Sequence, residues 1–355
     1  MGIAAYATPI NTGLELIEKA LELVPPDSHD AGRLLSRSIT SLRSEHERGQ
    51  EAIHGALAIA RQQQDRELEM RTLVSAACVD ISLCRFRECL EHNSQAIPLA
   101  QQVEQPFDES HARFDTSHAL SALGDLAEAA RHAEVLLEVA DRSGNRNWRA
   151  SAREINQSLC LARGNWQAAR EFADQGLALM PTDSNLLGSG ALVEYAVGDF
   201  ETGEAYLKRL LEIQRGQSEM PLFFPDVGAW TVPIVVIPMV ARCTEAPDCF
   251  DMLEAAAQSI ISSPSEYLGA VQGARIGLAL IAVQQGGGKE AKVLHDSLQE
   301  LRGTVYPQAP VGPGMAIDRL LGMLSHTMAE LDQAATHFEA ALAFCRNAGY
   351  RPELA

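Results

Sequence analysis

The ten histidines are scattered along the chain, and none belongs to an H-E-x-x-H motif or to a His/Cys group at metal-ligand spacing. His111 and His118 come nearest to a pair, because they lie seven residues apart on one face of an expected helix. Two helical turns are too long a step for two ligands of one ion. The sequence therefore predicts no metal site, and we expect these histidines to line a surface.

The segment from Gly286 to Lys289 reads GGGK, and Gly-rich loops that end in Lys cradle phosphates. The full phosphate-binding motif also needs Gly at position 283 and Ser or Thr at 290, where this chain has Val283 and Glu290. No strand is expected before it. We interpret the segment as a turn between two helices.

Nucleophilic catalysis has no recognisable motif here. The chain contains no G-x-S-x-G segment, and its carboxylates are spread over every expected helix, as on solvated faces. The weakest hypothesis is an enzyme that uses Asp226 and Tyr267. The sequence predicts no catalytic residue, no enzyme activity for this chain and no cofactor.

The composition restricts the class of partner. The 355 residues carry a net charge of −18, which opposes binding to nucleic acid and to anionic membranes. The apolar run from Trp230 to Ala241 is too short to span a bilayer. Seven cysteines without a C-x-x-C pair are typical of reduced thiols in a cytoplasmic protein.

The elements that must position any site follow a repeat. Each unit reads as two amphipathic helices joined by a turn, and a small residue five positions after the turn lets the second helix approach the first. The turn residues that anchor the units are Thr8, Glu47, Cys84, Gly124, Gly164, Gly198, Gly286 and Ala329. The long interval between 198 and 286 predicts a degenerate unit, with a turn near 241–247 and a second helix over 250–261.

The last unit, Asp318 to Gly349, resembles the tetratricopeptide repeat (TPR). Gly322, Ala334, Phe338 and Ala341 match the TPR pattern residue by residue. The resemblance implies an all-α fold: a right-handed superhelical solenoid of about eight to nine helix pairs. We expect residues 1–355 to form one such array, disrupted at about 217–261.

In a TPR array the first helix of each pair lines a concave groove, which gives candidate binding residues for a protein partner or a small-molecule inducer. The inward positions of each first helix are found by counting back from the turn residue of its unit. The polar and aromatic residues at these positions are Arg37, Arg71, His111, Phe114, His118, Glu154, Asn185, Tyr195, Arg319 and His326. Because three are arginines, an anionic or polar ligand, or the acidic segment of a partner, would suit this face.

The segment from 217 to 240 interrupts the repeat with Pro, Phe and Trp, and interruptions of a solenoid often form the binding face. Phe223, Phe224 and Trp230 are therefore further candidates. Alternatively, they plug a weak junction between repeats, and the sequence leaves both interpretations open.

The segments SEYLGAVQGARIGLALIAV, LHDSLQELRGTV and AIDRLLGMLSHTMAELDQAATHFEAALAFCRNAGYRPELA are similar to the helical C-terminal region of large bacterial signalling proteins. In that family a STAND-type ATPase precedes a TPR-like array, sometimes with a nucleotide cyclase domain or a LuxR-type helix-turn-helix. The resemblance implies that this chain is a fragment of such a protein.

Two main hypotheses follow. In the first, the array is a sensor or scaffold of a bacterial signalling or transcriptional regulator, and it couples binding to an ATPase or DNA-binding domain outside this chain. In the second, it is a stand-alone adaptor for protein–protein interaction. Self-association into a homo-oligomer is a further expectation, because uncapped solenoid ends expose apolar edges.

Overall fold

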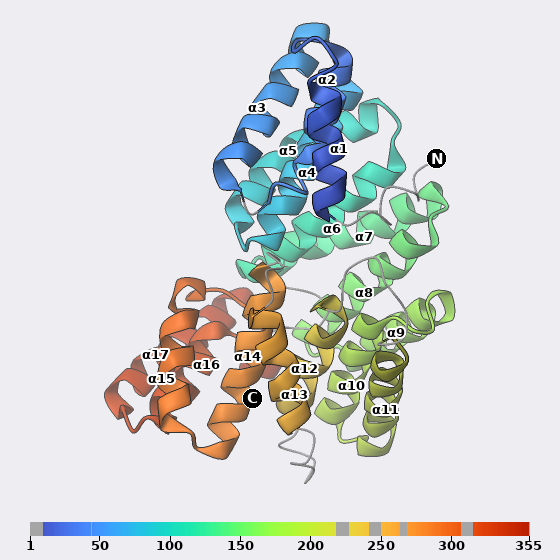
Figure 1. Cartoon of the computed structure of the whole chain (residues 1–355). Coiled ribbons are helices and arrows are strands. Elements are labelled where there is room, and N and C mark those ends of the chain that lie inside the picture. The colour runs from blue at the N-terminus through green and yellow to red at the C-terminus, as the bar shows by residue number, and fades with distance from the viewer. Residues whose placement is uncertain are drawn as a thin grey trace.

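The computed structural model describes residues 10–43, 45–217, 227–240, 250–262, 268–306 and 315–354. These residues form an all-α solenoid, as predicted (Figure 1). Its helices are α1 (Ile10–Leu21), α2 (His29–Ser38), α3 (His46–Gln63), α4 (Arg66–Ser82), α5 (Phe86–Gln102), α6 (Pro106–Ala122), α7 (Leu126–Ser143), α8 (Arg146–Ala162), α9 (Trp166–Leu179), α10 (Ser184–Val197), α11 (Phe200–Gln217), α12 (Val227–Val240), α13 (Phe250–Ser262), α14 (Leu268–Gln285), α15 (Gly288–Leu298), α16 (Ile317–Thr327) and α17 (Leu331–Ala348). Within the described residues, short 3₁₀ helices also cover Gln299–Leu301 and Pro352–Leu354.

The described helices from α2 to α17 form eight antiparallel pairs, and α1 packs against α2 at the N-terminal end. The first helix of each pair, the A helix, also contacts the A helix of the next pair. In Figure 1 the A helices α10, α12, α14 and α16 occupy the middle of the lower part, with α9 and α11 on one side and α15 and α17 on the other. The A helices thus form a continuous inner layer.

Six of the predicted turns lie between the A and B helices, whereas the anchor at Thr8 and the turn near 241–247 lie outside the described residues. The backbone takes a positive φ at Cys84, Gly124, Gly164, Gly198, Gly286 and Ala329. A left-handed residue at this point reverses the chain within three residues, and glycine adopts it without a Cβ penalty. The Gly286 segment is therefore the turn before α15, as predicted, and no strand precedes it.

The predicted anchor at Glu47 is wrong. Glu47 lies inside α3, whereas the other B helices begin two residues after their anchor, as α5 does after Cys84. The turn therefore comes before α3, and Gly49 supplies the small residue: a Cβ on Gly49 would lie 3.3 Å from the Leu42 carbonyl oxygen. The degenerate sequence of this unit hid the shift.

The degenerate unit consists of α12 and α13, and α13 covers the predicted range. Glycines on both neighbouring A helices allow close packing on α12. A Cβ on Gly188 would lie 2.5 Å from a Val232 methyl carbon, and one on Gly277 would lie 2.3 Å from an Ile234 methyl carbon. Its described apolar side chains from Val232 to Ile237 are buried. This half of the interruption is therefore part of the core.

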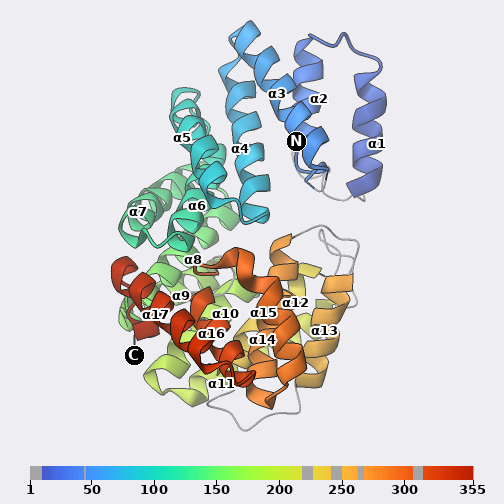
Figure 2. The same ribbon diagram turned by 90° about the vertical axis from the view of Figure 1, so that its left-hand side faces the viewer.

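The C-terminal unit folds back onto the middle of the array: Ala341 and Cys345 of α17 share an apolar cluster with Leu159 and Ala162 of α8, and Figure 2 shows α15, α16 and α17 in front of the lower part of the array. The backbone N–H of Val305 donates to the carbonyl of Ala122 at the end of α6, over 3.0 Å. The Tyr350 hydroxyl donates to the Ser121 carbonyl, also over 3.0 Å. Leu136 of α7 and Ile155 of α8 share one apolar cluster with Tyr350. The solenoid is thus closed on itself.

Candidate functional site

One face of α6 brings together three of the predicted site residues. The stripe consists of Phe107, His111, Phe114 and His118. Its members are three or four residues apart, so they share one helical face. The A helices α4 and α8 pack against α6 on its two sides. The stripe is therefore the centre of the candidate site.

Trp148 in the first turn of α8 completes an aromatic cluster, by which we mean Phe107, Phe114 and Trp148. The ring centroid of Trp148 lies 5.8 Å from that of Phe107 and 5.8 Å from that of Phe114, both edge to face. The His111 ring is 5.1 Å from Trp148 on the same face. Phe107 is 46% exposed, and the other two rings are half-buried. Apolar surface thus remains open to a partner.

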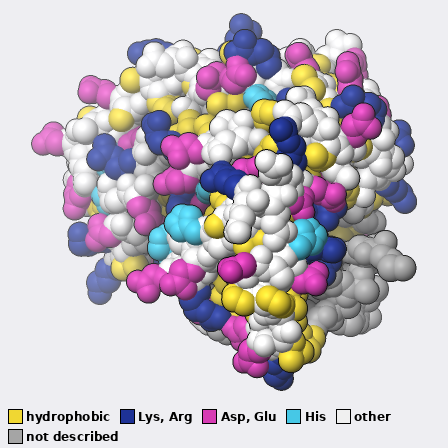
Figure 3. Space-filling model, turned by 90° about the horizontal axis from the view of Figure 1, so that it is seen from above, with side chains coloured by type: hydrophobic (Ala, Val, Ile, Leu, Met, Phe, Trp, Pro, Cys, Tyr) yellow, Lys and Arg dark blue, Asp and Glu magenta, His cyan; other side chains and the backbone are white. Residues whose placement is uncertain are grey.

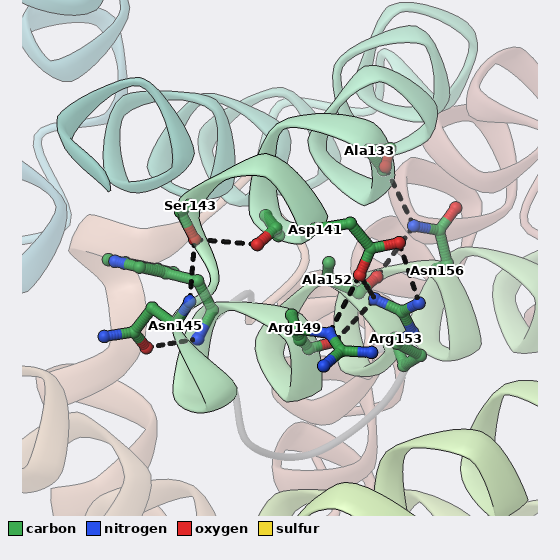
Figure 4. A network of polar contacts seen from close by, with 10 residues as sticks. Ala133, Asp141, Ser143, Asn145, Arg149, Ala152, Arg153 and Asn156 are labelled. Carbon is green, nitrogen blue, oxygen red and sulfur yellow. Dashed lines mark hydrogen bonds and ion pairs between the residues drawn. The ribbon is translucent and has the colours of Figure 1, made fainter. Parts of the chain in front are cut away.

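The N-cap of α8 fixes the position of Trp148. The side-chain oxygen of Asn145 accepts hydrogen bonds from the backbone N–H groups of Asn147 and Trp148, over 2.9 and 3.1 Å. The Asn145 N–H in turn donates to the Ser143 hydroxyl (Figure 4). An N-cap of this kind satisfies donors that the helix itself leaves unpaired. The cap therefore holds the backbone at Trp148 in a defined helical conformation.

The rest of α8 is held to α7 by polar contacts. Asp141 accepts from Arg149 over 2.9 Å and pairs with Arg153 over 3.4 Å, and Asn156 donates to the Ala133 carbonyl over 2.9 Å (Figure 4). Burial acts to raise the pKa of Asp141, but the hydrogen bonds and charges of Arg153 and Arg149 hold it below its ordinary value. Asp141 is thus ionised and anchors the helix that carries Trp148.

On the other side of the stripe, His111 meets Cys78 of α4 and Asp115 of α6. The Nε2 atom of His111 lies 3.4 Å from an Asp115 carboxylate oxygen. Burial opposes the protonated imidazole, but the Asp115 charge and the neighbouring Cys78 outweigh it and raise the pKa of His111 to about 9. Burial raises the pKa of Asp115 to about 6 against the pull of His111. At neutral pH these two groups form an ion pair.

The outer edge of the site carries mixed charge. Burial raises the pKa of Asp108, although the charges of Arg71 and His111 lower it. Arg71 itself is exposed and forms an ion pair with Glu67 over 2.7 Å. Two carboxylates, Asp108 and Glu67, therefore accompany Arg71, which is one of the predicted binding residues.

Two other predicted residues are part of the packing between helices. Glu154 is 3% exposed; burial and the charge of Asp183 raise its pKa well above the ordinary value, against a hydrogen bond from Asn185. The Tyr195 hydroxyl donates to Glu204 of α11 over 3.1 Å. Neither side chain belongs to the site at α6.

The structure does not bring the three predicted arginines together. Arg319 pairs with Glu353 over 2.6 Å at the C-terminal unit. Arg37 is exposed on α2. Its assignment to the inner face was counted back from Glu47, the anchor that proved wrong. Phe223 and Phe224 lie outside the described residues, as do Asp226 and Tyr267. Trp230 lies in α12, but its side chain is not among those described.

Four residues of the site were not predicted from the sequence: Cys78, Phe107, Asp115 and Trp148. Phe107 stands four residues before His111, so extending the stripe by one turn would have found it. Cys78 occupies the same position relative to its turn as His118 does in the next unit. The contact of Trp148 with Phe107 depends on the angle between α6 and α8, which no local pattern encodes.

Comparison with known proteins identifies the fold. No protein family and no curated protein matches the chain. The chain is similar to the solved structure of a Rap protein in complex with competence and sporulation factor, with 11% identity, a TM-score of 0.59, and coverage of 95% of this chain and 92% of that chain. The TPR domain of P58(IPK) matches at 11% identity over 97% of this chain and 92% of that chain, but its TM-score is only 0.22.

The surface adds two observations. No described helix is both long and apolar enough to cross a membrane. On the face shown in Figure 3, acidic and basic side chains are interspersed. The aromatic cluster and the groups around His111 therefore remain the most specific feature of the described residues.

Proposed function

We propose that this chain is a protein-binding array whose inner layer takes an extended segment of a partner at the aromatic cluster. The observation that carries the proposal is that two consecutive A helices present three rings together, of which Phe107 is 46% exposed. Aromatic side chains grouped in this way are typical centres of interfaces, because they bury much apolar area at low entropic cost.

The charge of the chain defines the partner further. Asp108 and Glu67 flank the cluster, and the net charge is −18. The partner segment would therefore carry an apolar anchor next to Lys or Arg, which long-range attraction would guide to the site. The arginines predicted for an anionic ligand are ion-paired or distant, so they favour this ligand class less.

Closure of the solenoid creates contacts that would transmit a movement of α6, caused by partner binding, to the C-terminal unit. Helix α6 carries the stripe along its length and receives the C-terminal unit at its end, through Ser121 and Ala122. The end of α8 is bonded in the same way, since the Arg351 N–H donates to the Ala162 carbonyl over 3.0 Å. A partner that shifts α6 against α8 would thus move the C-terminal unit.

This coupling suits a sensor or scaffold of a bacterial signalling or transcriptional regulator, acting in the cytoplasm on an ATPase or DNA-binding domain outside this chain. The resemblance of the C-terminal segments supports it, as does the likeness to a Rap protein that binds competence and sporulation factor. A stand-alone adaptor remains the alternative, and it requires the same binding site without the coupling.

Selection from a display library of random peptides tests the binding site. We expect the wild-type chain to enrich peptides with an aromatic or aliphatic residue beside Lys or Arg. Phe107→Ala should weaken binding of the selected peptides at least about tenfold, since truncation of a central interface residue costs about 2 kcal/mol or more. Trp148→Ala should act in the same direction.

The control is Val293→Ala, which truncates a 70% exposed side chain on the B helix α15. It should leave peptide affinity unchanged. If the selected peptides bind Phe107→Ala and Trp148→Ala as tightly as the wild type, while both variants keep the wild-type melting temperature, the proposed site is wrong.

A further inference from the structure

The side chains of Cys78, His111 and Asp115 converge at the junction of α4 and α6. The Cys78 sulfur, a ring nitrogen of His111 and a carboxylate oxygen of Asp115 all lie within 4.8 Å of one another. His111 and Asp115 stand one helical turn apart on α6, the spacing that lets two side chains of one helix reach the same ion. Cys78 approaches from the neighbouring A helix.

These three groups are ligands of the kind that zinc prefers. Zinc in proteins takes thiolate, imidazole and carboxylate ligands at about 2.0–2.3 Å, so tetrahedral ligands are about 3.4–3.8 Å apart. Rotation of side chains by about 1 Å would bring the present atoms to this geometry. A thiolate, a carboxylate and a neutral imidazole also balance the charge of a divalent ion, which favours a half-buried site.

A second observation points to a ligand at this place. The Asp115 side chain is 8% exposed, yet no described group donates a hydrogen bond to its Oδ2 atom. This oxygen faces His111 Nε2 at 3.4 Å. A buried carboxylate oxygen normally accepts hydrogen bonds, and the ion pair with the His111 ring at 3.4 Å supplies none, so a bound metal ion would satisfy this oxygen.

We propose that Cys78, His111 and Asp115 bind one Zn²⁺ ion between α4 and α6, with a fourth coordination position left for water. Binding releases the proton of the Cys78 thiol to solvent, together with that of His111 where the ring is protonated. The ion joins two consecutive A helices directly beside Trp148, which packs on the His111 ring. This inference does not depend on the proposed partner.

Cobalt(II) tests the proposal, because a cobalt–thiolate bond has a charge-transfer band that other cobalt ligands lack. We expect titration of the whole chain, reduced with a non-thiol reagent, to develop this band up to one equivalent. Zn²⁺ should then abolish it by displacement. Cys78→Ser should remove the band, and Asp115→Asn should lower cobalt affinity at least about tenfold.

Cys160→Ser is the matched control, since Cys160 is a partly buried thiol on α8 that is not one of the three proposed zinc ligands. It should keep the band. Absence of a saturable band in the wild type overturns the proposal, and so does a band that survives Cys78→Ser. Circular dichroism identifies a variant that has lost its helices, and His111→Gln is then tested in its place. We expect His111→Gln to lose cobalt affinity. Cobalt affinity equal to that of the wild type would contradict the proposed site.

Discussion

The ring of Phe344 in α17 lies directly over Gly124, the turn residue between α6 and α7. A Cβ built on Gly124 would lie 2.9 Å from the ring carbon Cζ of Phe344 and 3.1 Å from the Cβ of Ala348. Gly124 also has a φ of +87°, which side chains other than that of glycine rarely adopt. This glycine therefore serves both the local turn and the closure of the solenoid.

Gly124→Ala should destabilise the chain more than the same change at another turn. Alanine in the left-handed region costs about 1–2 kcal/mol, and the crowding against Phe344 adds about 1–3 kcal/mol. Urea unfolding, followed by circular dichroism, measures the difference in free energy of unfolding.

The matched variant is Gly198→Ala, because Gly198 has a φ of +84° in the equivalent turn and no atom within 4 Å of its added Cβ. It carries the strain without the crowding. Equal losses of stability in the two variants would show that α17 does not dock on the α6–α7 turn in solution.

The array was predictable because its signals are local. A left-handed turn followed by a small residue recurs in most units, and it located Cys84 and Ala329 although neither is glycine. The signal failed at Glu47, where the small residue Ala52 imitated Gly49. Closure of the solenoid was not predictable, since the bond between Val305 and Ala122 depends on curvature summed over several units.

The candidate site was half predictable for the same reason. His111, Phe114 and His118 follow from the position of one turn on one helix. Cys78 and Trp148 join them only because α4 and α8 pack on either side of α6, at angles set by side chains throughout the interface. Residue spacing in the sequence therefore predicts which side chains share one face of a helix. A cluster formed by side chains of several helices can be identified only once the packing of those helices is known.

Glu154→Gln should stabilise the chain at high pH. Burial and Asp183 raise the pKa of Glu154 in the folded state, so its contribution to stability is fully present below the unfolded pKa of about 4.3 and is lost as the pH rises through the folded value. The neutral amide avoids this loss. Melting temperatures should rise relative to the wild type at pH 8 and converge with it near pH 4.

Glu138→Gln tests whether the effect belongs to the buried carboxyl, since Glu138 is exposed on α7. This control should leave the dependence of the melting temperature on pH close to that of the wild type. A Glu154→Gln variant that is less stable than the wild type at pH 8 would contradict the assignment.

His337→Gln should flatten the stability profile on the acidic side. Burial and Arg302 lower the pKa of His337, outweighing Asp318, and its Nε2 atom lies 3.4 Å from that of His295. The neutral ring is thus favoured in the folded state, so stability is present above the unfolded pKa of about 6.5 and is lost as the pH falls below it. The measurement is the melting temperature from pH 7.5 to 5.

His326→Gln is the comparison for that series, because His326 is exposed at the end of α16. The His326→Gln variant should lose as much stability as the wild type when the pH falls from 7.5 to 5. If His337→Gln loses as much stability as the wild type between pH 7.5 and 5, the buried histidine pair is not its source.

Asn145→Ala should weaken the site through the backbone, without removing a ring. The side chain caps the N–H groups of Asn147 and Trp148, and loss of an N-cap costs about 1 kcal/mol. The first turn of α8 then frays, so Trp148 no longer holds a fixed position against Phe107. Peptides selected on the wild type should bind less tightly, whereas Asn147→Ala, which leaves the cap intact, should bind normally. Unchanged peptide affinity with reduced helix stability would show that binding does not depend on an ordered Trp148.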